Sequence, residues 1–260
     1  MKRNLKDSRA IITGASSGIG RALALEMARQ GAKLVVVARR EDRLRALVEE
    51  ICAIGQPVEP VVGDVTDPAV RQQAVDSALA RFGGLDVLVN NAGVGAMGLF
   101  EDADPTRVRR VMEVNFFALV EMTRLALPHL KQGIKPLLVN VSSILGHRGV
   151  PYSSEYSASK FAVQGFSESI RAEWTRLGID VLVVSPGTTE TEFFERVIER
   201  TAEPKWPEHK PISAAEVARR VVKAMRAGRH EVVPYFWGRV LCGLNRLSPG
   251  LVDRLMAKYV

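Results

Sequence analysis

Residues 10–30 read Ala-Ile-Ile-Thr-Gly-Ala-Ser-Ser-Gly-Ile-Gly-Arg-Ala-Leu-Ala-Leu-Glu-Met-Ala-Arg-Gln. The apolar run at residues 10–13 predicts a short buried strand, and the spacing of apolar residues from 19 to 30 predicts a helix. The turn between them has the pattern T-G-x-x-x-G-x-G. Glycine lets the backbone approach a phosphate closely, and the amides and dipole at the start of a helix favour its charge. The stretch therefore predicts a phosphate-binding turn, and a turn whose glycines bind nothing is the alternative.

The same alternation of strand and helix continues along the chain. Further strands are predicted at residues 33–38, 58–62, 85–89, 137–141, 179–184 and 230–233, and further helices at residues 41–54, 68–82, 105–127, 156–177 and 214–226. This order predicts an α/β fold, a Rossmann-type doubly wound parallel sheet of about seven strands with helices on both faces. Because the chain has no internal repeat, linker or low-complexity tract, residues 1–260 are expected to form one domain.

The composition excludes several classes of protein. A content of 47% hydrophobic and 25% charged residues is typical of a soluble globular domain and unlike a disordered chain. Residues 1–10 carry four basic residues and no apolar stretch, so they predict neither a signal peptide nor a membrane span. Cys52 and Cys242 match no metal or redox spacing, and the histidines are scattered. We therefore expect a cytoplasmic protein without a disulfide or a metal site.

A candidate catalytic pair lies in the predicted helix 156–177. Tyr156 and Lys160 are four residues apart, so they share one helix face. A phenol loses its proton near pH 10, and a fixed cation beside it lowers that pKa toward neutrality. Tyr156 is thus a candidate proton donor, although Tyr-x-x-x-Lys also occurs by chance on many helices. Ser143 follows the predicted strand 137–141, at the strand end where α/β folds place their sites.

Asparagines occur at two further positions that matter. Asn115 is the polar member of the apolar stripe on the predicted helix 105–127, so it is either satisfied within the structure or part of a site. The motif Asn90-Asn91-Ala92-Gly93 follows the predicted strand 85–89. A structural role and a direct ligand contact are both open for its asparagines.

Taken in order, these motifs resemble those of the short-chain dehydrogenase/reductase family. The resemblance covers about residues 8–230 and includes the glycine turn, the Asn90 motif, Asn115, Ser143, Tyr156 with Lys160, and Pro186-Gly187. It implies that Tyr156 donates a proton and that Ser143 polarises the substrate oxygen. It also implies that Lys160 lowers the tyrosine pKa and holds the nicotinamide ribose, and that Asn115 bends its helix and holds a water in line with the lysine. The residues that it implies at the cofactor are Gly14, Ser16, Ser17, Gly18, Ile19, Gly20, Arg39, Asp64, Val65, Asn91, Ala92, Gly93, Tyr156, Lys160, Pro186, Gly187, Thr189 and Thr191.

The residues after the predicted strand 33–38 favour NADP(H) over NAD(H). They are Arg39 and Arg40, where an NAD-preferring enzyme would offer an acidic residue to the adenosine ribose. Arg39 can make a charge-assisted contact with a 2′-phosphate. The alternative is that both arginines are ordinary solvated residues. Ser17 departs from family members that carry a lysine or arginine there, and Thr189 replaces a more usual valine or isoleucine.

The resemblance implies an NADP(H)-dependent oxidoreductase that transfers hydride between nicotinamide and a carbonyl or alcohol substrate, as a carbonyl reductase or an alcohol dehydrogenase does. The alternative is a non-catalytic member of the fold, a cofactor-binding regulator or scaffold.

Residues 188–212 contain aromatic residues and prolines, which suits a substrate lid. A hydrophobic substrate is suggested by Leu145, Val150, Tyr152, Phe193, Phe194 and Trp206, which as core residues would carry no such meaning.

The C-terminal tail, residues 236–260, predicts two amphipathic helices, the second with Ser248 as its cap and Pro249 as its first residue. Residues 205–260 contain eleven Lys+Arg and four Asp+Glu, and this balance of +7 equals the formal charge of the whole chain. No nucleic-acid-binding motif accompanies it, so we expect no nucleic-acid partner. The tail is expected to pack on its own protein or another subunit, or to contact an anionic membrane surface peripherally.

By resemblance, the helices 105–127 and 156–177 form the contact of a homodimer or homotetramer.

Overall fold

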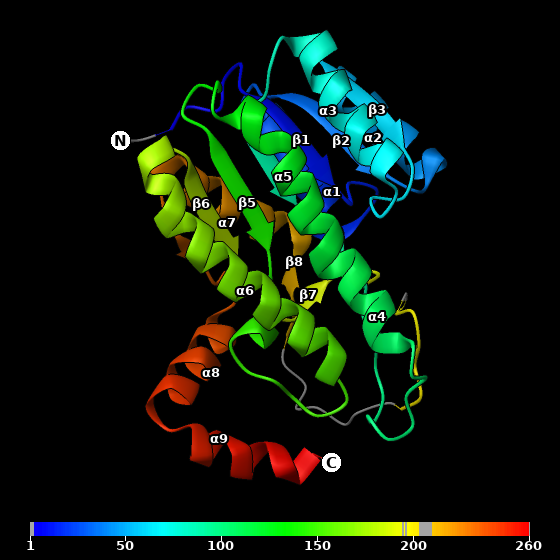
Figure 1. Cartoon of the computed structure of the whole chain (residues 1–260), viewed down its shortest axis with the longest axis vertical. Helices are drawn as coiled ribbons and strands as arrows, with labels where there is room; N and C mark the ends of the chain where they lie inside the picture. Colours follow the sequence, from blue (N-terminus) through cyan, green and yellow to red (C-terminus); the bar gives the residue numbers. More distant parts are fainter. Residues whose placement is uncertain (1–2, 194, 196, 203–209, 260) are drawn as a thin grey trace.

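The computed structural model describes residues 3–193, 195, 197–202 and 210–259 of the chain. Its strands are β1 (Arg9–Thr13), β2 (Lys33–Ala38), β3 (Val58–Val62), β4 (Val87–Asn90), β5 (Leu137–Val141), β6 (Asp180–Val184), β7 (Thr189–Glu190), β8 (Ile212–Ser213) and β9 (Glu231–Val232). Its helices are α1 (Gly18–Arg29), α2 (Glu41–Ala53), α3 (Pro68–Phe82), α4 (Arg107–Met112), α5 (Ala118–Leu130), α6 (Ser154–Trp174), α7 (Ala214–Ala227), α8 (Phe236–Leu247) and α9 (Pro249–Met256). Figure 1 shows the sheet at the centre, with α8 and α9 projecting beyond it.

Seven parallel strands form the central sheet in the order β3-β2-β1-β4-β5-β6-β9. This order confirms the predicted doubly wound Rossmann-type sheet. From β1 the chain adds strands toward one edge of the sheet, and from β4 it adds them toward the other edge. The order therefore reverses between β1 and β4, where connections leave the carboxyl ends of the strands in opposite directions and open a crevice.

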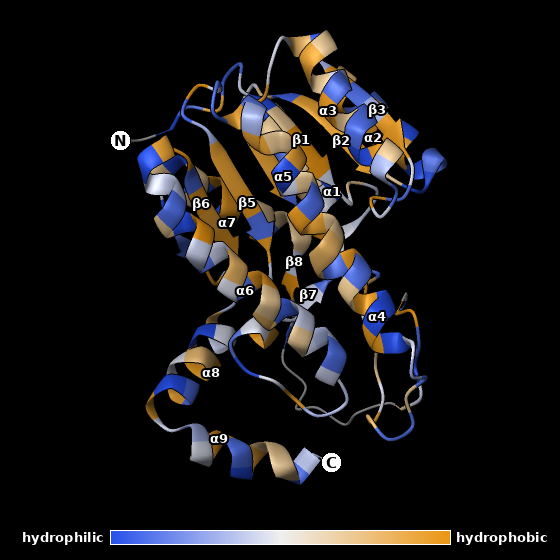
Figure 2. Cartoon of the chain, in the orientation of Figure 1, coloured by the Kyte–Doolittle hydropathy of each residue, from blue (hydrophilic) through white to orange (hydrophobic). Residues whose placement is uncertain are grey.

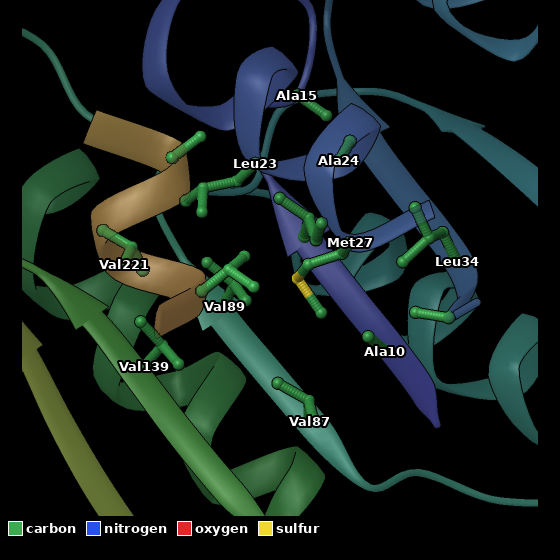
Figure 3. Close-up of a cluster of buried hydrophobic side chains, with 14 of the residues drawn as sticks. Ala10, Ala15, Leu23, Ala24, Met27, Leu34, Val87, Val89, Val139 and Val221 are labelled. Atoms are coloured by element: carbon green, nitrogen blue, oxygen red, sulfur yellow. The ribbon is translucent and has the colours of Figure 1, made fainter. Parts of the chain in front are cut away.

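The central strands are buried on both faces because alternate side chains meet different helices. Ile12, Val36 and Val89 belong to the hydrophobic layer beneath α1, α2 and α7. Their neighbours Ile11 and Val35 belong to the opposite layer, beneath α3, α5 and α6. Figure 3 shows the first layer, in which residues of α1 and α7 gather over β1, β4 and β5. Figure 2 shows the same distribution as apolar strands beneath helices with polar outer faces.

The predicted helix 105–127 is interrupted in the structure. A π-helical segment, Glu113–Phe117, separates α4 from α5, and Asn115 lies within it. This agrees with the bend that the family resemblance implies at Asn115. The helix begins two residues later than predicted, at Arg107. In the turn before it, the Asp104 carboxylate accepts hydrogen bonds from the backbone and hydroxyl of Thr106 at 2.7 and 2.5 Å.

Two details at the C-terminal end differ from expectation. The short parallel pair β7 and β8 was not predicted, because strands of two residues have no periodicity to recognise. Ser248 does precede α9, but its side chain makes no capping hydrogen bond, and its backbone carbonyl accepts from Leu251 and Val252 instead. None of the helices within the described residues has both the length and the apolar character needed to cross a bilayer.

The glycine turn packs so tightly against the end of β4 that a larger residue at position 20 has no space. A Cβ at Gly20 would lie 2.3 Å from both the Asn91 side-chain nitrogen and the Gly14 carbonyl oxygen. We predict that Gly20→Ala lowers the free energy of unfolding by about 1–3 kcal/mol through overpacking. Denaturant unfolding measures this change.

Gly165 provides the matched control, since it lies in α6 and a Cβ there would meet nothing within 4 Å. Gly165→Ala is expected to be neutral or to stabilise the protein by about 0.5–1 kcal/mol. Equal effects of the two substitutions would contradict the close packing of the turn.

Candidate functional site

A cavity of about 500 Å³ lies at the carboxyl ends of the central strands, at the point where the strand order reverses. It brings together most of the residues predicted at the site. The predicted residues that line it are Gly14, Ser16, Ser17, Gly18, Ile19, Arg39, Asp64, Val65, Asn91, Ala92, Gly93, Ser143, Tyr156, Lys160, Pro186, Gly187, Thr189 and Thr191. Gly20 and Asn115 are not in this lining and act from behind it, through the packing of the turn and of the loop after β4.

The glycine turn presents bare backbone to this cavity. Gly14 and Gly18 have φ angles of +68° and +53°, which disfavour residues with side chains. A Cβ on Gly14 would lie 2.8 Å from the Cα of Ala92, and one on Gly18 would lie 3.0 Å from the Thr191 side chain. Because α1 begins directly at this turn, a phosphate in the cavity would meet free helix-terminal amides. The chain thus has a cradle that fits the pyrophosphate of a dinucleotide.

Asn91 fastens this cradle to the end of β4. Its side-chain nitrogen donates to the carbonyl oxygens of Thr13 and Gly14 at 3.0 and 3.1 Å. The Thr13 hydroxyl in turn accepts from the backbone amides of Asn91 and Ala92 at 3.0 and 3.1 Å. Asn90, one residue earlier, donates to Thr123 and is buried in the sheet. Both asparagines therefore have structural roles, and Asn91 also lines the cavity.

Ser143, Tyr156 and Lys160 meet at the end of β5. Lys160 is 4% exposed, and its Nζ donates to the carbonyl oxygen of Val141 at 2.9 Å. The same Nζ lies 5.6 Å from the centre of the Tyr156 ring. The Ser143 hydroxyl oxygen accepts from the Leu145 amide at 3.1 Å, and the hydroxyl is near enough to the Tyr156 phenol to influence its pKa. A phenol, a hydroxyl and an ammonium thus converge on one wall of the cavity.

Lys160 was predicted to lower the pKa of Tyr156, but in the protein chain by itself this pKa is raised. Burial raises the pKa of Tyr156 to about 12, and the Ser143 hydroxyl only partly opposes this rise. Burial also lowers the pKa of Lys160 to about 8. Removal from water disfavours both charged forms, and at this separation the ammonium does not overcome that cost for the phenolate. Tyr156 is consequently held as the neutral phenol at neutral pH.

Asn115 has its side chain fully engaged. Its oxygen accepts from the Val94 amide at 2.8 Å, and its nitrogen donates to the Val94 carbonyl at 3.0 Å and to the Ser159 hydroxyl at 2.9 Å. The residue therefore ties the loop after β4 to α6, the helix that carries Tyr156 and Lys160. A Cβ on Gly93 would lie 3.2 Å from the Asn115 oxygen and 3.7 Å from Lys160 Nζ, so Gly93 leaves space between the two groups.

Comparisons with known proteins agree with this geometry. The family described as short chain dehydrogenase matches residues 8–202. The chain belongs to the short-chain dehydrogenase/reductase family. It is 40% identical over 245 residues to 11-beta-hydroxysteroid dehydrogenase-like 4A of Arabidopsis thaliana, which covers 93% of this chain and 81% of that protein. It is 35% identical over 272 residues to dehydrogenase/reductase SDR family member 7B of Mus musculus, covering 98% and 82%.

Two solved members of the family have the same fold. A short-chain dehydrogenase/reductase from Burkholderia phymatum in complex with NAD has a TM-score of 0.87 and 26% identity, covering 96% of each chain. An alcohol dehydrogenase from Thermococcus sibiricus complexed with 5-hydroxy-NADP has a TM-score of 0.77 and 26% identity, covering 87% of this chain and 95% of that one.

The two arginines after β2 differ in their surroundings. Arg39, the one chosen from the sequence, is 66% exposed, and its Nη1 lies 3.3 Å from the Asp64 carboxylate. Arg40 is 26% exposed and donates from Nε and Nη2 to the Ser16 hydroxyl at 3.3 and 3.2 Å. Both line the cavity, so Arg40 belongs with the predicted set although sequence analysis gave it no contact.

A buried ion pair that sequence analysis missed supports the start of α6. Arg107 is fully buried, and its guanidinium contacts the Glu155 carboxylate at 2.8 Å and that of Glu199 at 3.0 Å. Glu155 directly precedes Tyr156, and its pKa is lowered by the hydrogen bonds of Ser154 and Arg107 against the effect of burial. The only sequence signal was an arginine in the predicted helix 105–127, which has the same appearance when solvated.

Glu231 joins three segments of this short-chain dehydrogenase around the site. One oxygen of its carboxylate lies 2.7 Å from His147 Nε2, 2.9 Å from the Ser185 hydroxyl and 3.1 Å from the Gln164 side-chain nitrogen. His147 lies four residues after Ser143, Ser185 directly precedes Pro186, and Gln164 lies one helical turn after Lys160. Burial alone would raise the pKa of Glu231, but the hydrogen bond and charge of His147, with those of the other donors, lower it to about 2.

Apolar residues cover part of the cavity next to Tyr156. Leu145 and Phe193 line it, and the Phe193 ring lies 5.5 Å from the Tyr156 ring. Val150 and Tyr152 are partly buried outside this lining. Phe194 and Trp206, also predicted for an apolar pocket, lie outside the described residues, as does part of the expected lid at 188–212.

The Glu231 cluster makes stability depend on pH. Because the native pKa is about 2 and the ordinary value is 4.5, the native hydrogen bonds stabilise the protein above pH 4.5, and this contribution is lost as the pH falls toward 2. We predict that Glu231→Gln lowers the free energy of unfolding at neutral pH by on the order of 2 kcal/mol. The difference from wild type should shrink below pH 4.5. Denaturant unfolding across this range measures both effects.

Glu41→Gln is the control for this prediction, because Glu41 pairs with Arg45 on an exposed surface. Its effect at neutral pH should stay below about 1 kcal/mol. A Glu231→Gln difference that is the same at every pH would show that the carboxylate charge contributes nothing.

Proposed function

We propose that this short-chain dehydrogenase/reductase is an NADP(H)-dependent oxidoreductase that transfers hydride between nicotinamide and a carbonyl or alcohol substrate. The observation that carries the proposal is the convergence of Ser143, Tyr156 and Lys160 on a cavity whose opposite end is a glycine turn suited to pyrophosphate. The solved relatives with NAD and with 5-hydroxy-NADP support a nicotinamide cofactor. All four residues that the family resemblance implies for catalysis are present: Asn115, Ser143, Tyr156 and Lys160. Their presence favours an enzyme over the non-catalytic alternative.

A nicotinamide cofactor bound in the cavity would supply or accept the hydride. Tyr156, neutral at physiological pH, donates its proton to the oxygen of a carbonyl substrate as negative charge develops there. Ser143 donates a hydrogen bond to the same oxygen. Lys160 supplies positive charge beside the phenol and hydrogen-bond donors toward the nicotinamide ribose, and Asn115 holds the loop through Gly93 in place next to it.

The remaining predicted residues would hold the dinucleotide. We assign the pyrophosphate to the turn from Gly14 to Gly20 and to Thr191, and the adenine side to Asp64 and Val65. Pro186, Gly187 and Thr189 would border the nicotinamide, with Asn91 to Gly93 along the middle. A preference for NADP(H) is supported by Arg39 and Arg40 in the cavity lining at the end of β2.

The substrate side of the cavity supports a hydrophobic carbonyl or alcohol. Leu145 and Phe193 give it apolar surface next to Tyr156. Relatives named as hydroxysteroid dehydrogenases are consistent with this class of substrate.

We predict that Tyr156→Phe binds NADPH like wild type but loses about 10²–10⁴-fold in kcat, since the proton donor alone is removed. The measurement is cofactor fluorescence titration together with NADPH oxidation on a panel of apolar ketones, aldehydes and quinones. Turnover by the variant near the wild-type rate would remove Tyr156 from the mechanism. Wild-type protein that binds NADPH and reduces no compound in a broad panel would favour the non-catalytic regulator or scaffold.

We further propose that the protein forms a homodimer or homotetramer. Exposed apolar residues on the expected helical contact support this proposal: Val108 on α4, Phe117 in the π-helical segment and Phe161 on α6. A polar outer face would have been expected of helices that never meet a partner.

The tail is a second proposed contact surface, for an anionic membrane. Its outer apolar residues are exposed in the protomer, including Trp237 at 53% and Leu247 at 87%. Arg239, Arg246 and Arg254 are exposed beside them. Exposed aromatic and leucine side chains next to cations suit the boundary between lipid headgroups and acyl chains. The tail would then attach the protein peripherally to the source of a lipophilic substrate.

We predict that the protein cosediments with anionic vesicles at low salt and that Trp237→Asp with Leu247→Asp abolishes this binding. Ile134→Asp is the control, because Ile134 is 76% exposed far from the tail. Failure of wild type to bind at low salt would reject the membrane contact. Light scattering on the same variants would show whether the tail instead holds a subunit contact, through a fall to a smaller oligomer.

A further inference from the structure

A carboxylate lies against Arg40, the neighbour of the arginine that was predicted to contact a 2′-phosphate. Glu192 follows β7 and lines the same cavity as Arg39 and Arg40. One of its oxygens lies 2.8 Å from Arg40 Nη1, and the other lies 3.0 Å from Arg43 Nη1. Its side chain is 30% exposed, so the contacts are partly shielded from solvent.

Arg40 connects this carboxylate to the glycine turn. Its Nε and Nη2 donate to the hydroxyl of Ser16, a residue of the turn, while its Nη1 points to Glu192. A guanidinium beside a glycine turn is the kind of group that binds a phosphate on the adenosine ribose, and it binds carboxylate and phosphate through the same donors. Glu192 therefore occupies donors that such a phosphate would use.

We propose that Glu192 is a specificity-determining residue that competes with the 2′-phosphate of NADP(H) for Arg40 and Arg43. This inference rests on the proposed function. A phosphate next to these arginines meets the like charge of the carboxylate, so it must displace Glu192 or bear the repulsion. NAD(H), which lacks the 2′-phosphate, leaves the Arg40–Glu192–Arg43 contacts intact. Glu192 therefore reduces the difference in affinity between NADP(H) and NAD(H). The chain should accept NAD(H) more readily than the Arg39-Arg40 pair suggests.

The experiment compares binding of 2′,5′-ADP and 5′-ADP, two cofactor fragments that differ in the 2′-phosphate, by isothermal titration calorimetry. The proteins are the full-length wild type, Glu192→Gln and the control Glu216→Gln. Glu216 also contacts two arginines, Arg219 and Arg220, but it lies on α7 outside the cavity lining. We expect Glu192→Gln to bind 2′,5′-ADP about tenfold more tightly, as removal of one like charge at a partly exposed site provides. Its affinity for 5′-ADP should be unchanged, and Glu216→Gln should match wild type for both.

The outcomes separate the two levels of the proposal. If wild type binds neither fragment, the dinucleotide site and the proposed function fail. If wild type binds 5′-ADP and Glu192→Gln does not tighten 2′,5′-ADP, or weakens it, Glu192 does not compete and this inference alone is overturned. Equal tightening by Glu216→Gln would also overturn it, because the effect would then be one of net charge. Circular dichroism at the titration temperature confirms that each variant is folded.

Discussion

The hydrogen bonds between Thr13 and the residues after β4 hold the site together. They join the carboxyl ends of β1 and β4, the two strands between which the sheet order reverses. Asn91 adds bonds to the Thr13 and Gly14 carbonyls, so the glycine turn has a fixed position relative to the loop that leads to Gly93. Since Asn115 and Lys160 both lie next to Gly93 in that loop, the glycine turn and the Tyr156–Lys160 side of the cavity share one scaffold.

Burial determines how the reactive groups behave. A buried ammonium needs hydrogen-bond acceptors, and Lys160 finds one in the Val141 carbonyl at the last residue of β5. The same burial raises the pKa of Tyr156 and lowers that of Lys160, so both residues are held nearer their neutral forms than the motif alone suggests. A neutral phenol is the form that can donate a proton. The low-dielectric surroundings that oppose its ionisation would also strengthen any hydrogen bond that it donates inside the cavity.

The features that sequence could predict are those with local causes. Strand alternation, helix periodicity and the glycine turn depend on neighbours in the chain, and they predicted the seven-stranded sheet and placed most of its strands and helices to within about three residues of the observed bounds. The residues that line the cavity could be predicted because the family motifs occur in a fixed order along the chain. The pairs Arg107–Glu155 and His147–Glu231 join residues 48 and 84 positions apart. No periodicity marks such partners, because an arginine or glutamate on an exposed face looks the same in the sequence as one that meets a buried partner.

The arginines near the cofactor cavity show why residue type alone does not determine anion binding. Arg39 contacts Asp64, whose pKa is lowered by hydrogen bonds from Thr66 and the charge of Arg39 against the effect of burial. Arg40 and Arg43 both contact Glu192. A sequence motif shows only how many arginines follow β2. The affinity for a phosphate depends on how much more favourable its contacts with those arginines are than the arginine–carboxylate contacts that it would replace. The carboxylates in question follow β3 (Asp64) and β7 (Glu192), so they come from parts of the chain that the motif at the end of β2 does not include.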